Sequence, residues 1–275
     1  MMRLGICNEL FEGWSWEAIC EYVASLGYQG VEIAPFTLGP DPLQVSASER
    51  ARWRRVAEQA GLSIIGLHWL LAKTHGMQIT SPDLEVRRAT GRYLAGLVDL
   101  CADLGGRIMV FGSPAQRQIP TGTSVSLACD WAVDSWIECL PALAQRDVVL
   151  AIEPLGPQET NFLNTAEQTL QVIERLGSPH VRLHLDVKAM TAESRTFREI
   201  IWESRHQLVH FHANDPNLLG PGMGSVDFQE IVTALKEIGY QGWMSVEVFD
   251  FSPGARVIAE QSVTYLRRLC ELNSR

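Results

Sequence analysis

The chain has 275 residues, 46% of them hydrophobic and 20% charged, and a formal net charge of −9. This composition is typical of a globular protein with ample core material, and the acidic excess argues against a nucleic-acid partner, because domains that bind nucleic acids usually carry a basic face. No stretch approaches the ~20 uninterrupted apolar residues of a membrane span. The six cysteines are scattered without a C-x-x-C pair, so we expect a soluble, cytoplasmic protein with reduced cysteines and no membrane contact.

Short apolar segments alternate with amphipathic ones from one end of the chain to the other. The pattern predicts eight strands, at residues 3–7, 30–34, 63–68, 107–111, 148–152, 181–185, 207–212 and 243–247. Helices are expected between them, most clearly at residues 16–27, 48–61, 84–105, 165–177 and 227–239. Several of these helices begin at Ser, Thr or Asp and end at Gly, as helix capping favours.

The strands are often apolar on both faces, which is typical of a parallel sheet covered by helices. Eight strand–helix units without a break in composition predict one α/β domain over residues 1–275, a single (β/α)8 TIM barrel with eight parallel strands ringed by helices. A doubly wound open sheet is the alternative architecture. It is disfavoured because no G-x-G-x-x-G sequence follows the first strand.

Four predicted strands in the second half of the chain end on side chains that can bind a metal ion. These are Glu153, Asp186, His212 and Glu247. Each has an ordinary explanation when taken alone, such as a rim ion pair for a carboxylate or a satisfied core position for the histidine. In a (β/α)8 barrel, however, the C-terminal ends of the strands meet on the face that carries the chemistry. Together the four residues predict an oxygen-rich site with one imidazole, suited to Mn²⁺, Mg²⁺, Co²⁺ or Zn²⁺.

Several segments resemble one known family. They are AIEPLGPQETNFLNT, LHLDVKAM, HFHANDPN, PGMGSVDF and SVEVFD, and the resemblance extends over essentially the whole chain. The family consists of sugar isomerases and epimerases with the xylose-isomerase-like TIM barrel, and includes ketose 3-epimerases, hydroxypyruvate isomerase, inosose dehydratase and, more distantly, endonuclease IV. The resemblance implies one divalent metal ion, with Mn²⁺ as the first candidate, and a small keto sugar or polyol as the substrate.

The resemblance also implies roles for the four residues. Glu153 and Glu247 would be metal ligands and the acid/base pair on opposite faces of the sugar, while Asp186 and His212 would complete the metal shell. Removal of a proton beside a carbonyl leaves an enediolate, whose negative charge a chelated cation stabilises. Delivery of a proton to the opposite face of the same carbon is epimerisation, and transfer of the proton to the adjacent carbon is aldose–ketose isomerisation. The expected activity is therefore that of a metal-dependent isomerase or epimerase in carbohydrate metabolism.

Five further residues are candidates for substrate binding: Glu9, His68, Glu159, Lys188 and Asn214. In the epimerases a glutamate at the position of Glu159 hydrogen-bonds the substrate. His68 ends the third predicted strand and faces the same rim, and Glu9 comes just after the first predicted strand. Asn214, with the neighbouring Asp215, is expected to orient His212 or to donate to the substrate. The nearby aromatic residues would either form an apolar wall for the sugar or belong to the core; they are Phe36, Trp69 and Phe249.

Two positions depart from the usual pattern of the family. Ala189 stands where a His normally follows the metal-binding Asp by three residues, and Leu218 stands where an Arg normally follows the metal-binding His by six. Lys188 is a candidate replacement as a cation near the enediolate, or else it contacts solvent. These departures keep an alternative function open, that of a lyase or dehydratase acting on a keto-polyol or keto-glycoside through the same enediolate.

The remaining expectations concern partners. The loops after the seventh and eighth strands contain no Lys or Arg, which favours a non-phosphorylated substrate. A nuclease is disfavoured because residues 227–229 lack a D-x-H histidine, and a non-catalytic binding protein is disfavoured by the intact set of four ligands. Tryptophans in the predicted helices either form the interface of a homo-oligomer or pack the helices on the barrel; they are Trp53, Trp131, Trp136 and Trp202.

Overall fold

Eight parallel strands form a closed barrel in the structure, a computed structural model that describes residues 2–272. The strands are β1 (Arg3–Cys7), β2 (Gly30–Ile33), β3 (Ser63–Leu67), β4 (Ile108–Phe111), β5 (Val149–Ile152), β6 (Val181–Asp186), β7 (Leu208–Ala213) and β8 (Trp243–Val246). Each strand pairs with the next in sequence, and β1 pairs with β8 from Arg3 beside Trp243 to Ile6 beside Val246. The closure confirms the predicted (β/α)8 barrel and excludes an open sheet. The outermost residues of the predicted domain, 1 and 273–275, lie outside the described residues.

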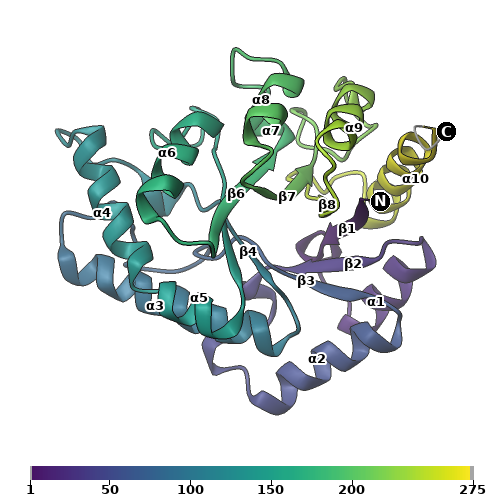
Figure 1. Cartoon of the computed structure of the whole chain (residues 1–275). Helices are drawn as coiled ribbons and strands as arrows, with labels where there is room; N and C mark the ends of the chain where they lie inside the picture. Colours follow the sequence, from purple (N-terminus) through teal and green to yellow (C-terminus); the bar gives the residue numbers. More distant parts are fainter. Residues whose placement is uncertain (1, 273–275) are drawn as a thin grey trace.

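Helices surround the strands on the outside of the barrel (Figure 1). They are α1 (Trp16–Ser25), α2 (Ala47–Gln59), α3 (Leu84–Asp103), α4 (Val125–Ile137), α5 (Leu140–Arg146), α6 (Ala166–Leu176), α7 (Val187–Met190), α8 (Phe197–Ser204), α9 (Phe228–Glu237) and α10 (Ala255–Leu272). The prediction of one helix for each strand was too simple, because α5 and α7 are additional. None of the helices within residues 2–272 is both long and apolar enough to span a bilayer.

Local sequence sets the ends of these helices. The Ser46 hydroxyl accepts the amide of Glu49 in the first turn of α2, and the Glu49 side chain returns to the Ser46 backbone, which makes a capping box. Thr165 caps the start of α6, and Gly177 ends it in the left-handed conformation, with φ of 58°. A new helix, α5, begins just before Pro141, because proline has no N–H with which to continue the hydrogen bonds of α4.

The interior of the barrel contains ionisable side chains where TIM barrels usually carry branched apolar ones. The register places His184 of β6 beside His210 of β7, and Asp186 beside His212. Alternate residues of a strand point to the same side, so these pairs form two layers, the second at the C-terminal end of the barrel. None of the four is more than 1% exposed, and Glu32 of β2 is equally buried.

The helix tryptophans differ in their surroundings. Trp136 is fully buried against Phe111, with ring centroids 5.4 Å apart, and Trp53 stacks on Trp16 at 4.4 Å. For Trp136 the structure supports packing of a helix on the barrel, one of the two predicted alternatives, while Trp53 packs α2 against α1. Trp202 on α8, by contrast, is 52% exposed.

Candidate metal and active site

The four predicted ligands converge at the C-terminal ends of four consecutive strands. Glu153 directly follows β5, Asp186 ends β6, His212 lies near the end of β7 and Glu247 directly follows β8. Each offers one ligand atom, and these atoms all lie within 4.8 Å of one another. The residues are buried, none more than 5% exposed. The structure therefore brings together the side chains that the strand ends singled out.

The close approach of three carboxylates shifts their pKa values. Burial raises the pKa of Glu153 well above its ordinary value, and repulsion from Asp186 and Glu247 raises it further. Burial and the charge of Glu247 raise the pKa of Asp186 from 3.8 to about 6. In Glu247 and His212 the attraction between carboxylate and imidazole outweighs burial, so the pKa of Glu247 is lowered and that of His212 is raised. Without a cation, protons therefore neutralise part of this cluster.

The donor set fits a divalent cation. Three carboxylates supply the oxygen atoms that Mn²⁺ and Mg²⁺ prefer, and the single imidazole is also suited to Co²⁺ or Zn²⁺. The repulsion that raises the pKa of Glu153 and Asp186 is the interaction that a bound cation would reverse. The cluster therefore has the chemistry of a cation site rather than that of an ion pair at the barrel rim.

Cation binding is expected to weaken as the pH falls through about 6, because Asp186 has a pKa of about 6 and must be ionised to bind. This pKa exceeds the ordinary value of 3.8, so the protonated carboxyl stabilises the cation-free fold below about pH 4, and that contribution is lost as the pH rises through about 6. The increase in Tm caused by Mn²⁺ should therefore grow between about pH 5 and about pH 8. Thermal unfolding with and without Mn²⁺ measures it, and an equal increase at both pH values would contradict Asp186 as a ligand.

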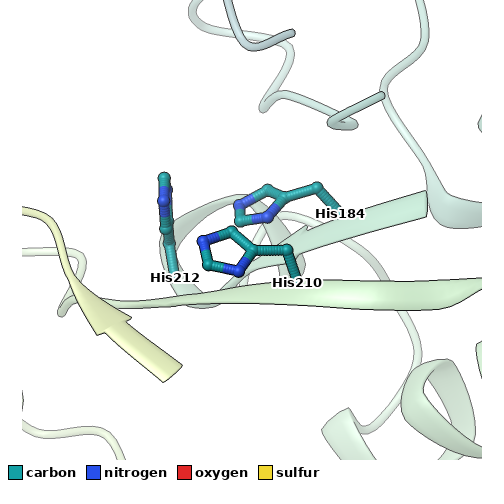
Figure 2. Close-up of side chains that lie close together, drawn as sticks. All are labelled: His184, His210 and His212. Atoms are coloured by element: carbon teal, nitrogen blue, oxygen red, sulfur yellow. The ribbon is translucent and has the colours of Figure 1, made fainter. Parts of the chain in front are cut away.

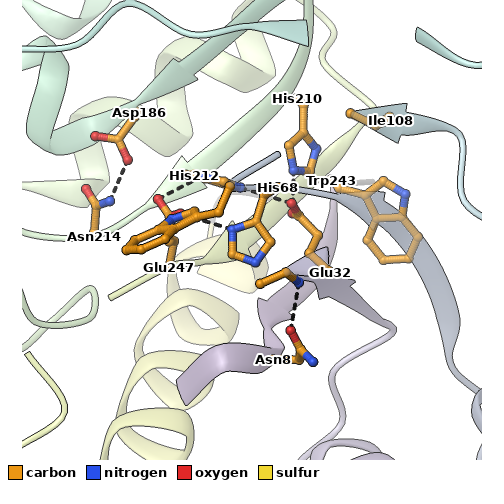
Figure 3. A network of polar contacts seen from close by, with 12 residues as sticks. Asn8, Glu32, His68, Ile108, Asp186, His210, His212, Asn214, Trp243 and Glu247 are labelled. Atoms are coloured by element: carbon orange, nitrogen blue, oxygen red, sulfur yellow. Dashed lines mark hydrogen bonds and ion pairs between the residues drawn. The ribbon is translucent and has the colours of Figure 1, made fainter. Parts of the chain in front are cut away.

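Asp186 is held by the start of α7 and by Asn214. Its Oδ1 accepts the amide of Ala189 at 2.8 Å, which makes Asp186 the N-cap of that helix. Its Oδ2 accepts the side-chain amide of Asn214 (Figure 3). The side-chain oxygen of Asn214 in turn accepts the amide of Lys188 at 2.9 Å. Asn214, predicted to contact the substrate or His212, is fully buried with its amide directed at Asp186.

Glu247 is surrounded by nitrogen atoms. Trp69 Nε1 donates to its Oε1 at 2.7 Å, and His68 Nδ1 lies 3.2 Å from the same oxygen. His212 Nδ1 lies 3.0 Å from the other oxygen (Figure 3). The second ring nitrogen of His68 lies 2.9 Å from Glu9 Oε2. The two predicted substrate contacts His68 and Glu9 therefore form a buried chain that ends on Glu247.

A cavity of about 290 Å³ opens beside the four ligands. The carboxylates of Glu153, Glu159 and Glu247 line it. Trp69 and Phe249 supply an aromatic wall, with their rings stacked 6.1 Å apart. The cavity thus combines carboxylates with an apolar face, which is the usual character of a small-molecule site.

Lys188 and Glu159 form an ion pair of 2.7 Å at this cavity. The Lys188 ammonium also lies 4.4 Å from the centre of the Phe249 ring. Burial would lower the pKa of Lys188, but Asp186 and Glu159 outweigh burial and raise it, so the amine stays charged. Both partners of the pair can also bond to hydroxyl groups, because an ammonium has three donors and a carboxylate has several lone pairs.

Arg117 supports Glu153, although nothing in the sequence singled it out. Its guanidinium is fully buried and donates to the backbone carbonyl oxygens of Glu153 at 2.6 Å and Phe111 at 2.5 Å. These contacts join the ends of β5 and β4. Burial lowers the pKa of Arg117 to about 10, which leaves it charged near neutral pH. Gly112 lies on the other side of the carboxylate, and a Cβ atom there would be 1.7 Å from Glu153 Oε2.

Three histidines gather in the barrel beside the four ligands. Figure 2 shows His184, His210 and His212 close together, and the ring centroids of His184 and His212 are 4.2 Å apart. Glu32 contacts His210 Nε2 with one oxygen and lies 3.1 Å from His212 Nε2 with the other. Burial alone would raise the pKa of Glu32, but the two histidines hold it well below its ordinary value. A fixed negative charge therefore faces the nitrogen of His212 that is turned away from Glu247.

Replacement of His184 by leucine is expected to leave the free energy of unfolding unchanged or to raise it. His184 is fully buried, and neither of its ring nitrogens has a hydrogen-bond partner among the described residues; such a group costs about 1–3 kcal/mol. The matched variant His210→Leu removes a partner of the ionised Glu32. It should lower the free energy of unfolding by about 3–5 kcal/mol. Urea unfolding of both variants measures this difference, and equal destabilisation would contradict it.

Known proteins share the architecture and a part of the sequence. Residues 20–269 match the family model described as xylose isomerase-like TIM barrel. The chain is 31% identical over 261 residues to L-ribulose 3-epimerase from Mesorhizobium japonicum, a match that covers 90% of this chain and 82% of that protein. It is 37% identical over 123 residues to D-psicose 3-epimerase from Enterocloster bolteae, covering 45% of this chain and 41% of that protein.

The fold has a close counterpart among solved structures. A crystal structure of D-psicose 3-epimerase in the presence of D-fructose superposes with a TM-score of 0.86, covering 98% of this chain and 99% of that chain at 22% sequence identity. The extent of the family match and the similarity to L-ribulose 3-epimerase lead to the same conclusion. The chain belongs to the xylose isomerase-like TIM barrel family.

Proposed function

We propose that the protein is a divalent-metal-dependent epimerase or isomerase of a small, non-phosphorylated keto sugar, formed by one domain over residues 1–275. The observation that carries the proposal is the convergence of Glu153 and Glu247 with Asp186 and His212 beside a cavity of about 290 Å³. Two relatives are named as 3-epimerases of psicose and ribulose, which supports this function over that of a nuclease or a binding protein.

Glu153 and Glu247 are the proposed proton-transfer pair. Both line the cavity, and they follow strands β5 and β8, with β6 and β7 between them, so they reach a bound sugar from different sides. One carboxylate takes the proton beside the carbonyl, and the other returns a proton to the opposite face. Arg117 holds the backbone of Glu153, and Trp69 and His68 hold the carboxylate of Glu247.

The four converging residues would hold the cation, for which we propose Mn²⁺ first and Mg²⁺, Co²⁺ or Zn²⁺ as alternatives. When bound, it would supply electrostatic stabilisation for the negative charge that develops on the carbonyl oxygen of the substrate. Asn214 positions Asp186, and Glu32 positions His212 through its other ring nitrogen. Partners of this kind commonly orient the ligands of a metal ion.

Lys188 and Glu159 are the proposed contacts to the sugar itself. They form a charged pair at the cavity of a chain that carries Ala189 and Leu218 in place of the family's usual His and Arg. A half-buried ammonium beside the cavity would favour the negative charge of an enediolate. We propose that His68, together with Glu9, acts on the reaction through Glu247 by fixing its carboxylate.

Incubation of the protein with Mn²⁺ and a panel of free ketoses in D₂O tests this function. The expected result is entry of deuterium at the carbon next to the carbonyl, together with formation of an epimer or an aldose and no loss of water. A dehydrated or cleaved product would favour the lyase alternative instead. Absence of both exchange and product with every ketose would overturn the proposal.

A further inference from the structure

A second cavity, of about 480 Å³, lies beside the first at the same end of the barrel. The two cavities share Trp69 and Lys73 in their walls. The rest of the second wall comes from segments that follow β1, β2 and β8. Neither Glu153 nor Glu247 lines it, so the proposed proton transfer does not explain its presence.

Seven aromatic side chains line this cavity, which is named the aromatic cleft. They are Phe11, Trp14, Trp16, Phe36, Trp53, Trp69 and Phe251. Phe11 and Trp14 pack edge to face with centroids 5.5 Å apart, and Trp14 remains half-buried. An aromatic face is apolar with a negative potential, so the C–H face of a sugar or another ring packs well against it. The aromatic cleft therefore suits a ring-shaped group with one apolar face.

Two polar side chains of the aromatic cleft are placed to bond to a ligand. Glu9 is 8% exposed; its Oε2 pairs with His68 Nε2 at 2.9 Å, while its Oε1 makes no hydrogen bond to the described residues. Lys73 is exposed, its ammonium lies 4.1 Å from the centre of the Phe36 ring, and it forms no ion pair with the residues that the structure describes. A carboxylate oxygen and an ammonium beside aromatic rings match the hydroxyl groups of a carbohydrate.

The partition between the two cavities is held in a fixed position. Trp69 and Lys73 have φ values of 52° and 60°, a left-handed conformation that is costly for residues other than glycine. The indole of Trp69 donates to Glu247 at 2.7 Å and stacks on Phe249. A sugar bound at Glu247 would therefore lie on one side of Trp69, and the aromatic cleft begins on the other side.

We propose that the aromatic cleft binds the second group of a glycoside, whose keto sugar occupies the cavity beside the four ligands. The inference rests on the proposed function and narrows the substrate from a free ketose to a keto-glycoside. A free monosaccharide in the smaller cavity would leave the larger one filled with water against seven aromatic side chains, which is unfavourable. The second group is a ring with an apolar face, either another sugar or an aromatic aglycone.

The kinetic test uses a keto sugar whose ketone is not its anomeric carbon, so that the ketone stays free in its glycosides. It compares the free sugar with two glycosides, one that carries glucose and one that carries a phenyl group. The wild-type protein is expected to show a kcat/KM at least about tenfold higher for one of the glycosides. Trp14→Ala should lower this kcat/KM about tenfold more than the kcat/KM for the free sugar. Phe251→Ala should do the same and is less able to disturb the fold, because Phe251 is 37% exposed. Trp202→Ala, exposed on α8 and in the wall of neither cavity, is the matched control.

A binding measurement provides a readout that needs no turnover. In the cation-free protein, cellobiose or phenyl β-glucoside should change the tryptophan fluorescence at a concentration at least about tenfold lower than glucose does, and Trp14→Ala should remove this difference. The two compounds separate a sugar from an aromatic aglycone as the second group. Equal binding of glucose and both glycosides, or an equal kinetic loss for free sugar and glycoside, would overturn the inference.

The proposed function and the aromatic cleft can fail separately. Deuterium exchange with free ketoses but no preference for any glycoside would refute the aromatic cleft and leave the proposed function intact. Absence of exchange with every keto compound would refute the proposed function, and the fluorescence measurement would still decide whether the aromatic cleft binds glycosides.

Discussion

Replacement of Glu153 by glutamine is expected to abolish formation of the epimer and to lower kcat by about 10²–10⁴-fold, because a neutral amide cannot transfer a proton. Glu247→Gln should have the same effect on epimer formation. The two variants should differ in D₂O, since each retains one carboxylate. Each should still exchange the proton of one epimer with solvent and fail to exchange that of the other, and NMR spectra recorded from either starting epimer measure this difference.

Loss of folding should not explain the result for Glu153→Gln. Burial and repulsion from Asp186 and Glu247 disfavour the ionised form of Glu153, as its raised pKa indicates, and the isosteric amide carries no charge. The Tm of the cation-free variant should therefore equal or exceed that of the wild type near neutral pH. Glu174→Gln, an exposed change on α6, is the control that should leave kcat unchanged. An epimerisation rate within about tenfold of the wild type in either active-site variant would contradict the two-base scheme.

Removal of the divalent cation by a chelator is expected to abolish turnover, and addition of Mn²⁺ should restore it. Stabilisation of developing charge by a metal ion is worth several kcal/mol, which corresponds to a loss of about 10³-fold or more. The barrel itself should remain folded, because its strands are closed by backbone hydrogen bonds and its apolar core does not depend on the four ligands. The expected observation is an unchanged far-UV circular dichroism spectrum with no activity.

A ligand variant separates loss of the cation from side effects of the chelator. Asp186→Asn should reproduce the loss of activity and should weaken the binding of Mn²⁺ in calorimetric titration, since an amide oxygen lacks the charge of a carboxylate. Asp130→Asn, an exposed change on α4, is the matched control. Full turnover by a protein that contains no detectable metal would contradict the metal-dependent mechanism.

The strands could be predicted closely because each is a short apolar run bounded by polar or turn residues. All eight lie within one residue of their predicted ends. The short helix α7 escaped prediction, because its four residues are too few to show a helical period and its cap is the side chain of Asp186, which the sequence marks only as a metal ligand. Pro141 marks the break between α4 and α5 in the sequence, because a proline rarely lies inside a helix. The prediction of one helix per strand did not take this proline into account.

The four converging residues could be found from the sequence because each stands at the end of a strand, and strand ends meet on one face of the barrel. Glu9 and His68 were also found as residues of this face. Their connection to Glu247 was not, because that contact joins segments after β1, β3 and β8, and no local pattern records which side chains meet across the barrel. The same holds for Asn214, whose partner Asp186 lies on a different strand.

The sequence also contains a pattern that predicts the other polar layer, formed by His184 and His210. His184 and His210 each precede a proposed ligand by two residues, and alternate residues of a strand face the same side, so the H-x-D and H-x-H patterns point to two stacked layers. Glu32 is the middle residue of the predicted strand 30–34, so a rule based on the ends of predicted strands does not detect it, although it lies next to the last residue of β2. Arg117 lies in a loop with no periodic pattern, and only the folded chain shows that its guanidinium binds the carbonyls at the ends of β4 and β5.

Gly112 couples the backbone after β4 to the position of the Glu153 carboxylate. A Cβ atom at position 112 would lie 1.7 Å from Glu153 Oε2, so any larger residue there must displace the end of that side chain. Because the carboxylate can rotate away, Gly112→Ala is expected to lower kcat much more than it lowers the Tm, although glycine takes no part in the chemistry. In a protein that already carries Gln at position 153, the same alanine should reduce activity little further, so the two positions are expected to show epistasis.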